Sequence, residues 1–441
     1  MMLLPDSAAA CVKRLENAGF AAYAVGGCVR DACLGLTPHD YDLCTAATPA
    51  EMKALFAGHT LVLAGEKHGT VGVVMDGEVV EITTFRTEGD YTDGRHPDQV
   101  RFVEDVDQDL SRRDFTVNAM AWSPTRGLAD PFGGQTDLQK GILRAVGDPE
   151  QRFREDPLRI LRGVRFAVRY GLIPDPATEK AMQAMAPLMD GLSRERVFDE
   201  LCKLLPLVAA EDLIRYATVI TQPIPELASA IGFDQCSPHH AYDLYTHIAH
   251  VTAAVPEDLT LRWAALLHDV GKVPTFTRDE NGRGHFYGHA KVGAPIADQI
   301  LHRLRAPTDL RTQVVTLVEQ HMIRLEPDRK LLRRRLSRFG KERTEQLLLL
   351  QTADMGSKGT GHEEELTAFH QVRQLLDELY GEDTCLTIRD LAIDGTDLLA
   401  LGFPADHTLG QCLRHLLEQV VDETLPNERN ALLAAASCHR S

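Results

Sequence analysis

Apolar and polar residues alternate differently on the two sides of residue 147. Before it, helical segments alternate with short runs that predict strands, at residues 21–25, 61–63, 69–75, 79–85 and 99–103. After the sequence Gly147-Asp148-Pro149, apolar positions recur at helical spacing almost to the end of the chain. The pattern predicts an α+β protein, with a small sheet near its start and helices in the rest.

Segments that contain proline or glycine divide this pattern into parts. Candidate boundaries lie at residues 147–149, 221–225 and 356–361. A chain of 441 residues is expected to form more than one domain, because single cores stop growing at roughly 250–300 residues. A loop at residues 87–98 carries Gly, Asp, Arg and Pro between two predicted strands, so we expect it to be mobile.

Composition places the chain among ordinary globular proteins, with 44% apolar and 25% charged residues. No apolar run approaches the roughly 20 residues that a membrane span needs, and the apolar stretch in residues 1–15 is too short for a secretory signal. The nine cysteines form no Cys-x-x-Cys pair, which predicts buried free thiols rather than disulfides or a cysteine zinc site. We therefore expect a cytoplasmic protein with no membrane partner.

The net charge of −17 argues against a wholly basic RNA-coating protein, although a phosphate backbone responds to local patches. Residues 152–169 hold six arginines beside Glu155 and Asp156, and residues 329–343 hold eight basic residues beside Glu342. Each patch predicts either a solvated helix face or a surface that contacts RNA.

A phosphate-binding turn is predicted at residues 26–31, Gly-Gly-Cys-Val-Arg-Asp, where a buried strand turns into a helix. Glycines let backbone N–H groups approach a phosphate closely, and a helix N-terminus favours negative charge. Arg30 can add a charge-assisted contact. Gly26, Gly27 and Arg30 are therefore candidate nucleotide-binding residues, with an ordinary glycine turn as the alternative.

Acidic residues follow at a spacing that suits metal binding. Asp40 and Asp42 are two apart in a segment predicted to be extended, so their carboxylates should leave the same face. Two such carboxylates can hold a pair of Mg²⁺ ions roughly 3.5–4 Å apart, which activate a hydroxyl and stabilise a leaving pyrophosphate. Glu81, in the strand predicted at residues 79–85, is a third catalytic candidate. A solvated turn is the alternative for Asp-x-Asp.

Residues 112–119 place paired cations beside an Asp and an Asn at a predicted helix start. Triphosphate and sugar recognition needs such groups, which makes Arg113, Asp114 and Asn118 candidates. An N-cap formed by Asp114 or Thr116 is the alternative.

A stripe of charged residues is predicted further on. Asp156, Arg159, Arg162 and Arg165 recur every three residues, so one helix face should carry a carboxylate and three guanidinium groups. A salt-bridged helix is the alternative. Because few acids oppose these arginines, their repulsion favours a bound anion.

Together these motifs resemble the class II tRNA nucleotidyltransferase and poly(A) polymerase family. The likeness rests on Val-Gly-Gly-Cys-Val-Arg-Asp, Asp-Tyr-Asp, Arg-Arg-Asp-Phe-Thr-Val-Asn-Ala, Glu-Asp-x-x-Arg and a fifth motif at residues 193–201, in the family's order. The resemblance implies a seahorse shape. Its expected parts are a polymerase-beta-like nucleotidyltransferase head with a small mixed sheet (1–146), an all-α neck that recognises the base (147–222), an HD-type helical domain (223–360) and a body and tail that dock tRNA (361–441).

The resemblance also implies template-independent addition of CMP and AMP, from CTP and ATP, to the tRNA 3′ end. Asp156 can only accept hydrogen bonds and Arg159 can only donate them. The pair would match the base edges of CTP and ATP and leave buried groups mismatched against UTP and GTP. A segment at residues 90–97 resembles the family's flexible loop, which is linked to the switch from C to A addition.

Residue roles follow from the same resemblance. Asp40 and Asp42 would hold Mg²⁺ in the head. The residues implied to contact the nucleotide are Gly27, Arg30, Arg113, Arg162 and Arg165.

A second cluster of candidate ligands lies in the middle of the chain. Residues 266–272, Leu-Leu-His-Asp-Val-Gly-Lys, follow an apolar helix and resemble the core of the HD phosphohydrolase superfamily. Adjacent His and Asp at a helix end can reach one divalent ion, and other helices can complete its shell. The resemblance implies a divalent transition metal and phosphoesterase activity on RNA ends or nucleotides. The predicted ligands are His247, His268, Asp269, His289, His321 and Asp354.

The leading hypothesis is therefore an enzyme that builds or repairs tRNA CCA ends without an obligatory protein partner. A close alternative is an enzyme limited to A addition, or a poly(A) polymerase with the same motifs. An alternative of another class is an HD phosphohydrolase whose catalytically inactive head binds RNA.

Overall fold

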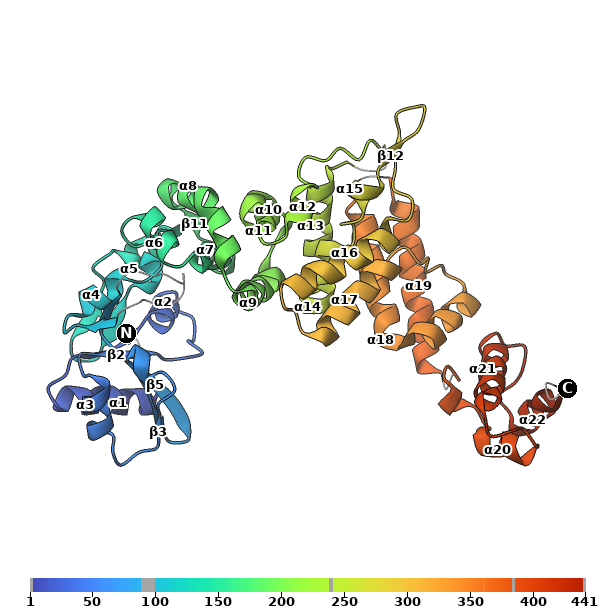
Figure 1. Ribbon diagram of the computed structural model, residues 1–441, viewed down its shortest axis with the longest axis horizontal. Coiled ribbons are helices and arrows are strands. Elements are labelled where there is room, and N and C mark those ends of the chain that lie inside the picture. The colour runs from blue at the N-terminus through green and yellow to red at the C-terminus, as the bar shows by residue number, and fades with distance from the viewer. Residues whose placement is uncertain (1–2, 89–99, 238–240, 360, 383–384, 439–441) are drawn as a thin grey trace. The chain divides into compact units, whose positions relative to one another are not determined.

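The computed structural model describes residues 3–88, 100–237, 241–359, 361–382 and 385–438. The predicted loop at 87–98 and the segment 90–97 lie almost wholly outside these ranges. The chain forms two compact units (Figure 1). The first comprises Met1–Val208 with Arg215–Ala228, and the second comprises Ala209–Ile214 with Ser229–Ser441.

A mixed sheet of strand order β3-β4-β5-β2-β1-β8-β9 organises the start of the first unit. Neighbouring strands are antiparallel, except that β2 and β5 run parallel with Leu43 opposite Ile82. A separate ribbon joins β6 (Arg86–Glu88) to β7 (Val100–Phe102). The strands of the mixed sheet are β1 (Ala22–Val25), β2 (Leu43–Thr45), β3 (Leu61–Val62), β4 (Thr70–Met75), β5 (Glu78–Thr84), β8 (Ala121–Ser123) and β9 (Gly127–Ala129).

Burial explains why these runs form strands. All four residues of β1 are buried, whereas burial alternates along the second half of β5 from Val80, as expected for a strand with one covered face. Helix α1 (Asp6–Asn17) contacts β1, β2 and β5. Its apolar side chains Cys11, Val12 and Leu15 are buried. The strands predicted from the sequence are confirmed, although the run at 99–103 joins the ribbon instead of the main sheet.

Helices make up most of the rest of the first unit. The short helices α4 (Val106–Ser111) and α5 (Gly134–Gln139) belong to the head, and Asp148 caps α6 with a proline at the first helical position. Phe115 of the head packs edge-to-face against Phe166, with ring centroids 5.9 Å apart. The longer helices are α6 (Pro149–Glu155), α7 (Leu158–Tyr170), α8 (Pro176–Met185) and α9 (Arg194–Leu204).

The second unit is almost entirely helical among its described residues. Its core surrounds Trp263, which is fully buried. A short hairpin of β12 (Thr277–Arg278) and β13 (Gly284–His285) interrupts the helices. The helices are α13 (Leu244–Ala254), α14 (Leu259–Leu267), α15 (Lys272–Thr275), α16 (His289–Arg303), α17 (Thr308–Gln320), α18 (Arg329–Gly356), α19 (Glu363–Gly381), α20 (Gly395–Ala400), α21 (His407–Val421) and α22 (Arg429–Cys438).

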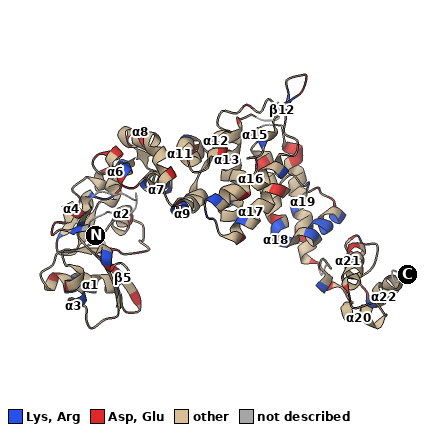
Figure 2. Ribbon diagram, in the orientation of Figure 1, with Lys and Arg blue, Asp and Glu red and all other residues tan. Residues whose placement is uncertain are grey.

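The basic patch predicted at residues 329–343 forms the first half of α18 (Figure 2). Several of its side chains have partners: Arg334 pairs with Asp422 at 2.5 Å, and Arg333 donates to the carbonyls of Val420 and Val421. These contacts tie this part of the patch to the end of α21.

The α+β prediction is confirmed. None of the nine cysteines, all of which lie within the described residues, forms a disulfide. Five are buried as expected, Cys202 and Cys236 are half-buried, and Cys33 and Cys438 are exposed, so the expectation of burial is wrong for these four. Each described helix is too short or too polar to cross a membrane.

Candidate functional sites

A cavity of about 440 Å³ lies in the first unit, between the head and α7. It brings together residues of all five motifs singled out in the sequence. Its lining residues are Gly26, Gly27, Arg30, Asp42, Arg112, Arg113, Asp114, Asn118, Asp156, Leu158, Arg159, Arg162, Phe166 and Arg196.

The two glycines lie where β1 turns into α2 (Gly27–Cys33). Gly26 has φ +76°, a conformation that disfavours other residues, and its N–H donates to the Met120 carbonyl at 3.0 Å. A Cβ on Gly26 would lie 2.8 Å from Nη1 of Arg113. The missing side chain thus leaves room for a guanidinium group beside the turn.

Arg30 is buried and fixed on several sides. Its guanidinium group donates to Asp31 at 2.7 and 2.9 Å and to the side-chain oxygen of Asn118. It also donates to the Tyr170 hydroxyl and lies 4.3 Å from the centre of the Tyr170 ring. Residues of the head and of α7 therefore position this cation together.

Asp42 lies just before β2, where its carbonyl accepts a hydrogen bond from Val25 N–H at 2.9 Å. The parallel pairing of Leu43 with Ile82 places the preceding residues, Asp42 and Glu81, side by side. Loss of hydration raises the pKa of Asp42 above its usual value, Arg113 lowers it, and the negative charges of Glu81 and Asp40 raise it further. The charges of Asp40 and Glu81 thus reach Asp42, which lines the cavity. Among the described residues, these three carboxylates do not form a group whose oxygens all lie within 4.8 Å of one another.

Asp114 joins the head to α7. It is buried and accepts hydrogen bonds from Arg162 at 2.7 and 2.9 Å and from Asn118 at 3.1 Å. Burial by itself would raise the pKa of Asp114, but Arg162 and Asn118 outweigh burial and lower it to about 2. Asp114 is therefore an ionised anchor for Arg162, and the N-cap alternative does not describe it.

Asp156 and Arg159 both line the cavity, but each already has protein partners. Asp156 accepts from Arg196 at 2.8 Å and from Leu158 N–H at 3.1 Å. Arg159 donates to Glu155 at 2.9 Å and to the Arg112 carbonyl at 2.9 Å.

The expectation of one helical stripe is wrong in two respects. Asp156 lies outside α7, with φ −142° and ψ 99°, because α6 ends at Glu155 and α7 begins at Leu158. Arg165 does not line the cavity; its Nε donates to Glu200 at 2.5 Å.

The argument from repulsion is also wrong. The arginines are not left unopposed, since Arg159, Arg162 and Arg165 pair with Glu155, Asp114 and Glu200, respectively. A bound anion is therefore not needed to hold them together.

Four lining residues were missed as site candidates: Arg112, Leu158, Phe166 and Arg196. Arg112 and Arg196 stand within motifs recognised in the sequence, so their position next to predicted residues was an available signal. Leu158 and Phe166 offered no chemical signal, because apolar helix residues are usually core.

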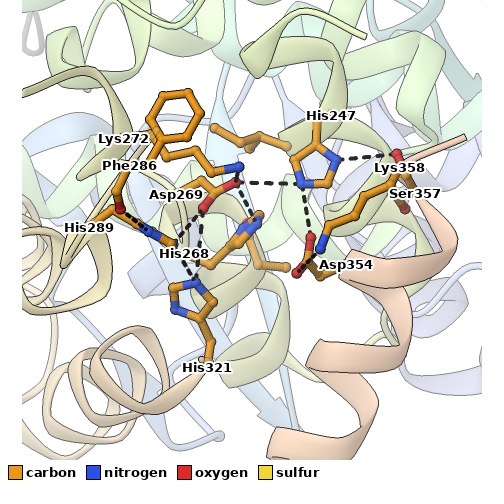
Figure 3. Close-up of polar contacts among 12 residues, drawn as sticks. His247, His268, Asp269, Lys272, Phe286, His289, His321, Asp354, Ser357 and Lys358 are labelled. Atoms are coloured by element: carbon orange, nitrogen blue, oxygen red, sulfur yellow. Dashed lines mark hydrogen bonds and ion pairs between the residues drawn. The ribbon is translucent and has the colours of Figure 1, made fainter. Parts of the chain in front are cut away.

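A second group lies within the second unit, where the six predicted ligands come together (Figure 3). Asp269 is central: its carboxylate lies 3.1 Å from His268 Nε2, 3.4 Å from His289 Nε2, 3.5 Å from His247 Nε2 and 3.9 Å from His321 Nε2. Asp354 of α18 completes the set, 3.1 Å from His247 Nε2.

Backbone carbonyls orient all four imidazole rings. Nδ1 lies within hydrogen-bond distance of Ser357 O in His247, Ala265 O in His268, Phe286 O in His289 and Val318 O in His321, at 2.7–3.2 Å. Donation from Nδ1 leaves Nε2 as the lone-pair atom, and all four Nε2 atoms face Asp269. This is the arrangement that histidines adopt around a metal ion.

Burial and charge favour the ligand forms of His321 and Asp269, whereas for His268 burial lowers the pKa but Asp269 raises it above its usual value. Burial and the nearby His268 lower the pKa of His321 to about 4, so its ring is neutral at neutral pH. Burial would raise the pKa of Asp269, but His268 and Lys272 hold it well below the usual value. His268 Nε2 and Asp269 Oδ2 are buried and lie 3.1 Å apart, and Lys272 Nζ lies 2.7 Å from the same carboxylate oxygen.

Comparison with known proteins covers both units. Residues 22–144 match the poly A polymerase head domain family, residues 171–230 the probable RNA and SrmB-binding site of polymerase A, and residues 288–436 tRNA nucleotidyltransferase domain 2.

Among curated proteins, the CCA-adding enzyme of Levilactobacillus brevis is 35% identical over 97% of this chain and 96% of its own length. That of Latilactobacillus sakei is 32% identical over 96% of both chains. Among solved structures, the Bacillus stearothermophilus CCA-adding enzyme in complex with CTP aligns with a TM-score of 0.70 and 28% identity, covering 99% of this chain and 98% of that one.

Proposed function

This chain belongs to the family of CCA-adding enzymes, and from that premise we propose that its head cavity joins CMP and AMP to the 3′ end of tRNA. The reaction is nucleotidyl transfer: the RNA 3′-hydroxyl attacks the α-phosphorus of CTP or ATP, and the bond to pyrophosphate breaks. The main structural support for this assignment is that Asp42 and Asp156 line the same cavity.

The carboxylates at and near the cavity suit metal ions. Nucleotidyltransferases of this class use divalent metals, and we propose Mg²⁺ held by Asp40, Asp42 and Glu81. Burial raises the pKa of Asp42 first, and the charges of Glu81 and Asp40 raise it further, so a nearby cation would favour the ionised carboxylate. When bound, these ions would supply positive charge that activates the hydroxyl and neutralises the leaving pyrophosphate.

The chain's own cations would orient the triphosphate. Gly26 and Gly27 allow close approach of the backbone, while Arg30 and Arg113 line the same wall. Arg30 is held by Asp31, Asn118 and Tyr170, so little side-chain entropy would be lost on binding.

We propose that Asp156 and Arg159 select the base, as their acceptor-only and donor-only groups suit the edges of cytosine and adenine. The contact of Arg196 with Asp156 occupies one carboxylate oxygen and fixes the carboxylate for the base. Arg162 would be placed by Asp114, and Arg165 would act indirectly by holding Glu200 and α9.

Incorporation assays test this function. tRNA ending at the discriminator base, at C or at CC is offered CTP or ATP alone. We expect CMP on the first two ends and AMP on the third. Labelled AMP on the CC end with no CMP at any end would instead support the A-adding alternative, and long A tails on any end would support a poly(A) polymerase.

A second function is favoured by the histidine cluster. We propose that His247, His268, Asp269, His289, His321 and Asp354 hold a divalent transition metal, which supplies Lewis acidity for phosphoester hydrolysis when bound. The support is the orientation of all four Nε2 atoms toward one carboxylate. Calorimetric titration with Mn²⁺ tests the site, and His268→Ala should lose the binding.

We also propose a division of labour along the chain: a catalytic head (1–146), a base-reading neck (147–222), a metal-binding domain (223–360) and a tRNA-docking tail (361–441). The segment 171–230, which matches the probable RNA and SrmB-binding site of polymerase A, supports RNA contact outside the head.

A further inference from the structure

The head cavity is rich in positive charge and holds one aromatic ring. Six of its lining residues are arginines and three are aspartates. Phe166 is the one aromatic side chain among the described residues that line it, and its exposed fraction is 5%. A ring in such a place is either ordinary core packing or a surface that holds the neighbouring cations.

Three arginines lie over the Phe166 ring. The guanidinium carbons of Arg165, Arg162 and Arg30 lie 4.4, 5.2 and 5.4 Å from the ring centroid, respectively. All three distances fall within the roughly 6 Å over which an aromatic face attracts a cation. Arg162 and Arg165 belong to α7, as Phe166 does, whereas Arg30 belongs to α2. One ring therefore contacts cations from two elements that line the cavity.

The Tyr170 ring extends this arrangement along α7. Positions 166 and 170 are four apart, so both rings leave the same face of the helix. The Tyr170 centroid lies 6.2 Å from that of Phe166 and 4.3 Å from the guanidinium carbon of Arg30. Its hydroxyl also accepts a hydrogen bond from Arg30. Arg30 is thus held by two rings in addition to its hydrogen bonds with Asp31 and Asn118.

Rings and carboxylates hold an arginine with different electrostatic consequences. A carboxylate cancels one unit of positive charge, whereas an aromatic face attracts the cation through its quadrupole and adds no net charge. Asp114 already bonds Nε and Nη2 of Arg162, and the Phe166 ring lies beside the same group. The Arg162 side chain remains 37% exposed, so it can still meet a ligand. The ring therefore restrains the cation and leaves the positive charge of the cavity in place.

We propose that Phe166 is a positioning residue for the triphosphate of CTP and ATP, a role that rests on the nucleotidyl transfer proposed above. It would hold Arg30 and Arg162 in the orientation that meets the phosphates before the nucleotide arrives, so less side-chain entropy is lost on binding. Stacking of the base on Phe166 is the competing role. It is disfavoured because the ring is almost fully buried and arginines lie over it.

A trifluorinated phenylalanine at position 166 tests the role of the ring face. Fluorine atoms withdraw electron density from the face and nearly preserve the shape of the side chain, so the attraction for cations falls while packing changes little. The ligand is inorganic triphosphate, which has no sugar or base, given to the full chain with Mg²⁺. We expect its affinity, measured by calorimetry, to fall about fivefold. Phe166→Leu should lower the affinity at least as much, because leucine has no ring face.

Nucleotide addition gives a second measurement. KM for CTP and KM for ATP should rise by the same factor in both variants, because the two nucleotides share the triphosphate, and kcat should change less. Stacking would instead raise the two KM values unequally, since a purine stacks more strongly than a pyrimidine. It would also leave the affinity for inorganic triphosphate unchanged, which would overturn the positioning role.

Phe153 provides the matched control. Its ring is fully buried and packs on Phe115, as the Phe166 ring does, with centroids 6.4 and 5.9 Å apart, respectively. No arginine or lysine lies over the Phe153 ring in the part of the chain that the structure describes. The trifluorinated residue at position 153 should therefore leave the affinity for inorganic triphosphate unchanged.

The outcomes separate this inference from the proposed function. If CMP and AMP are added but fluorination at position 166 lowers triphosphate affinity no more than fluorination at position 153, Phe166 only packs, and the proposed function stands. If neither nucleotide is added to any tRNA end, the proposed function is wrong. The triphosphate titrations then still decide whether the ring positions the cations.

Discussion

At the scale of single residues, Asp114 links the segment before residue 147 to α7 through Arg162. It is a buried carboxylate that holds Arg162 from another element, and its pKa is lowered to about 2. Breaking such a pair leaves a charge without its partner, which generally costs more than the pair contributes.

We expect Asp114→Asn to lower the free energy of unfolding by about 1–3 kcal/mol and to reduce nucleotide addition, because Arg162 loses its anchor. The folded pKa lies below the unfolded value of about 3.9, so the stabilisation is fully present above about pH 4 and is lost as the pH falls toward 2. Urea unfolding of both proteins between pH 7 and 3 measures the difference. A difference that stays constant below pH 4 would contradict this assignment.

The chemical types of the functional residues were the easiest feature to predict from the sequence. Glycines, carboxylates and arginines of the head motifs could be identified because their types imply their chemistry. Their partners could not: Arg165 meets Glu200 35 positions away, and no pattern in the sequence shows that α7 and α9 pack together.

At the scale of elements, tight turns place the functional side chains. Gly271, between α14 and α15, packs against the start of α16; a Cβ there would lie 2.2 Å from the His289 carbonyl and 2.6 Å from the Gly293 nitrogen. These are backbone atoms, so a side chain would displace the helix that carries His289.

We therefore expect Gly271→Ala to weaken Mn²⁺ binding about tenfold and to lower the thermal midpoint, since relieving the clash moves a proposed ligand. Calorimetry and thermal unfolding measure both effects. Gly381→Ala is the control, because no atom lies within 4 Å of its added Cβ. Equal Mn²⁺ affinities and thermal midpoints in the two variants would show that α16 tolerates the shift.

Strands were predictable because alternating burial leaves a direct trace in the sequence, but the break between α6 and α7 was missed. The signal was present in Pro157: a residue before proline avoids helical angles, and Asp156 is indeed extended. The three-residue spacing of Asp156 and the arginines suggested one continuous helix and led to the wrong prediction. Asp42 likewise falls just outside β2, where a side chain can face a cavity.

At the scale of the whole molecule, the two candidate sites belong to separate compact units. Helical periodicity predicted the change from sheet to helices. It could not predict which helices would bring six distant ligands together, because that depends on long-range packing.

We expect the two activities to be separable. Asp42→Ala should abolish nucleotide addition while leaving tRNA affinity and Mn²⁺ binding by the histidine cluster nearly unchanged. His268→Ala should abolish Mn²⁺ binding by the cluster while leaving nucleotide addition nearly unchanged. Incorporation assays, tRNA binding and calorimetry measure the three quantities. Loss of nucleotide addition in His268→Ala with retained hydrolysis would contradict this division.

Main-chain carbonyls hold the ring orientations of the four histidines. A centre assembled in this way can be emptied by a chelator and refilled without refolding the helices around it. The metal bound at the proposed site in a living cell would then depend on supply and intrinsic affinity, so the proposed hydrolysis would respond to changes in the cell's transition-metal content.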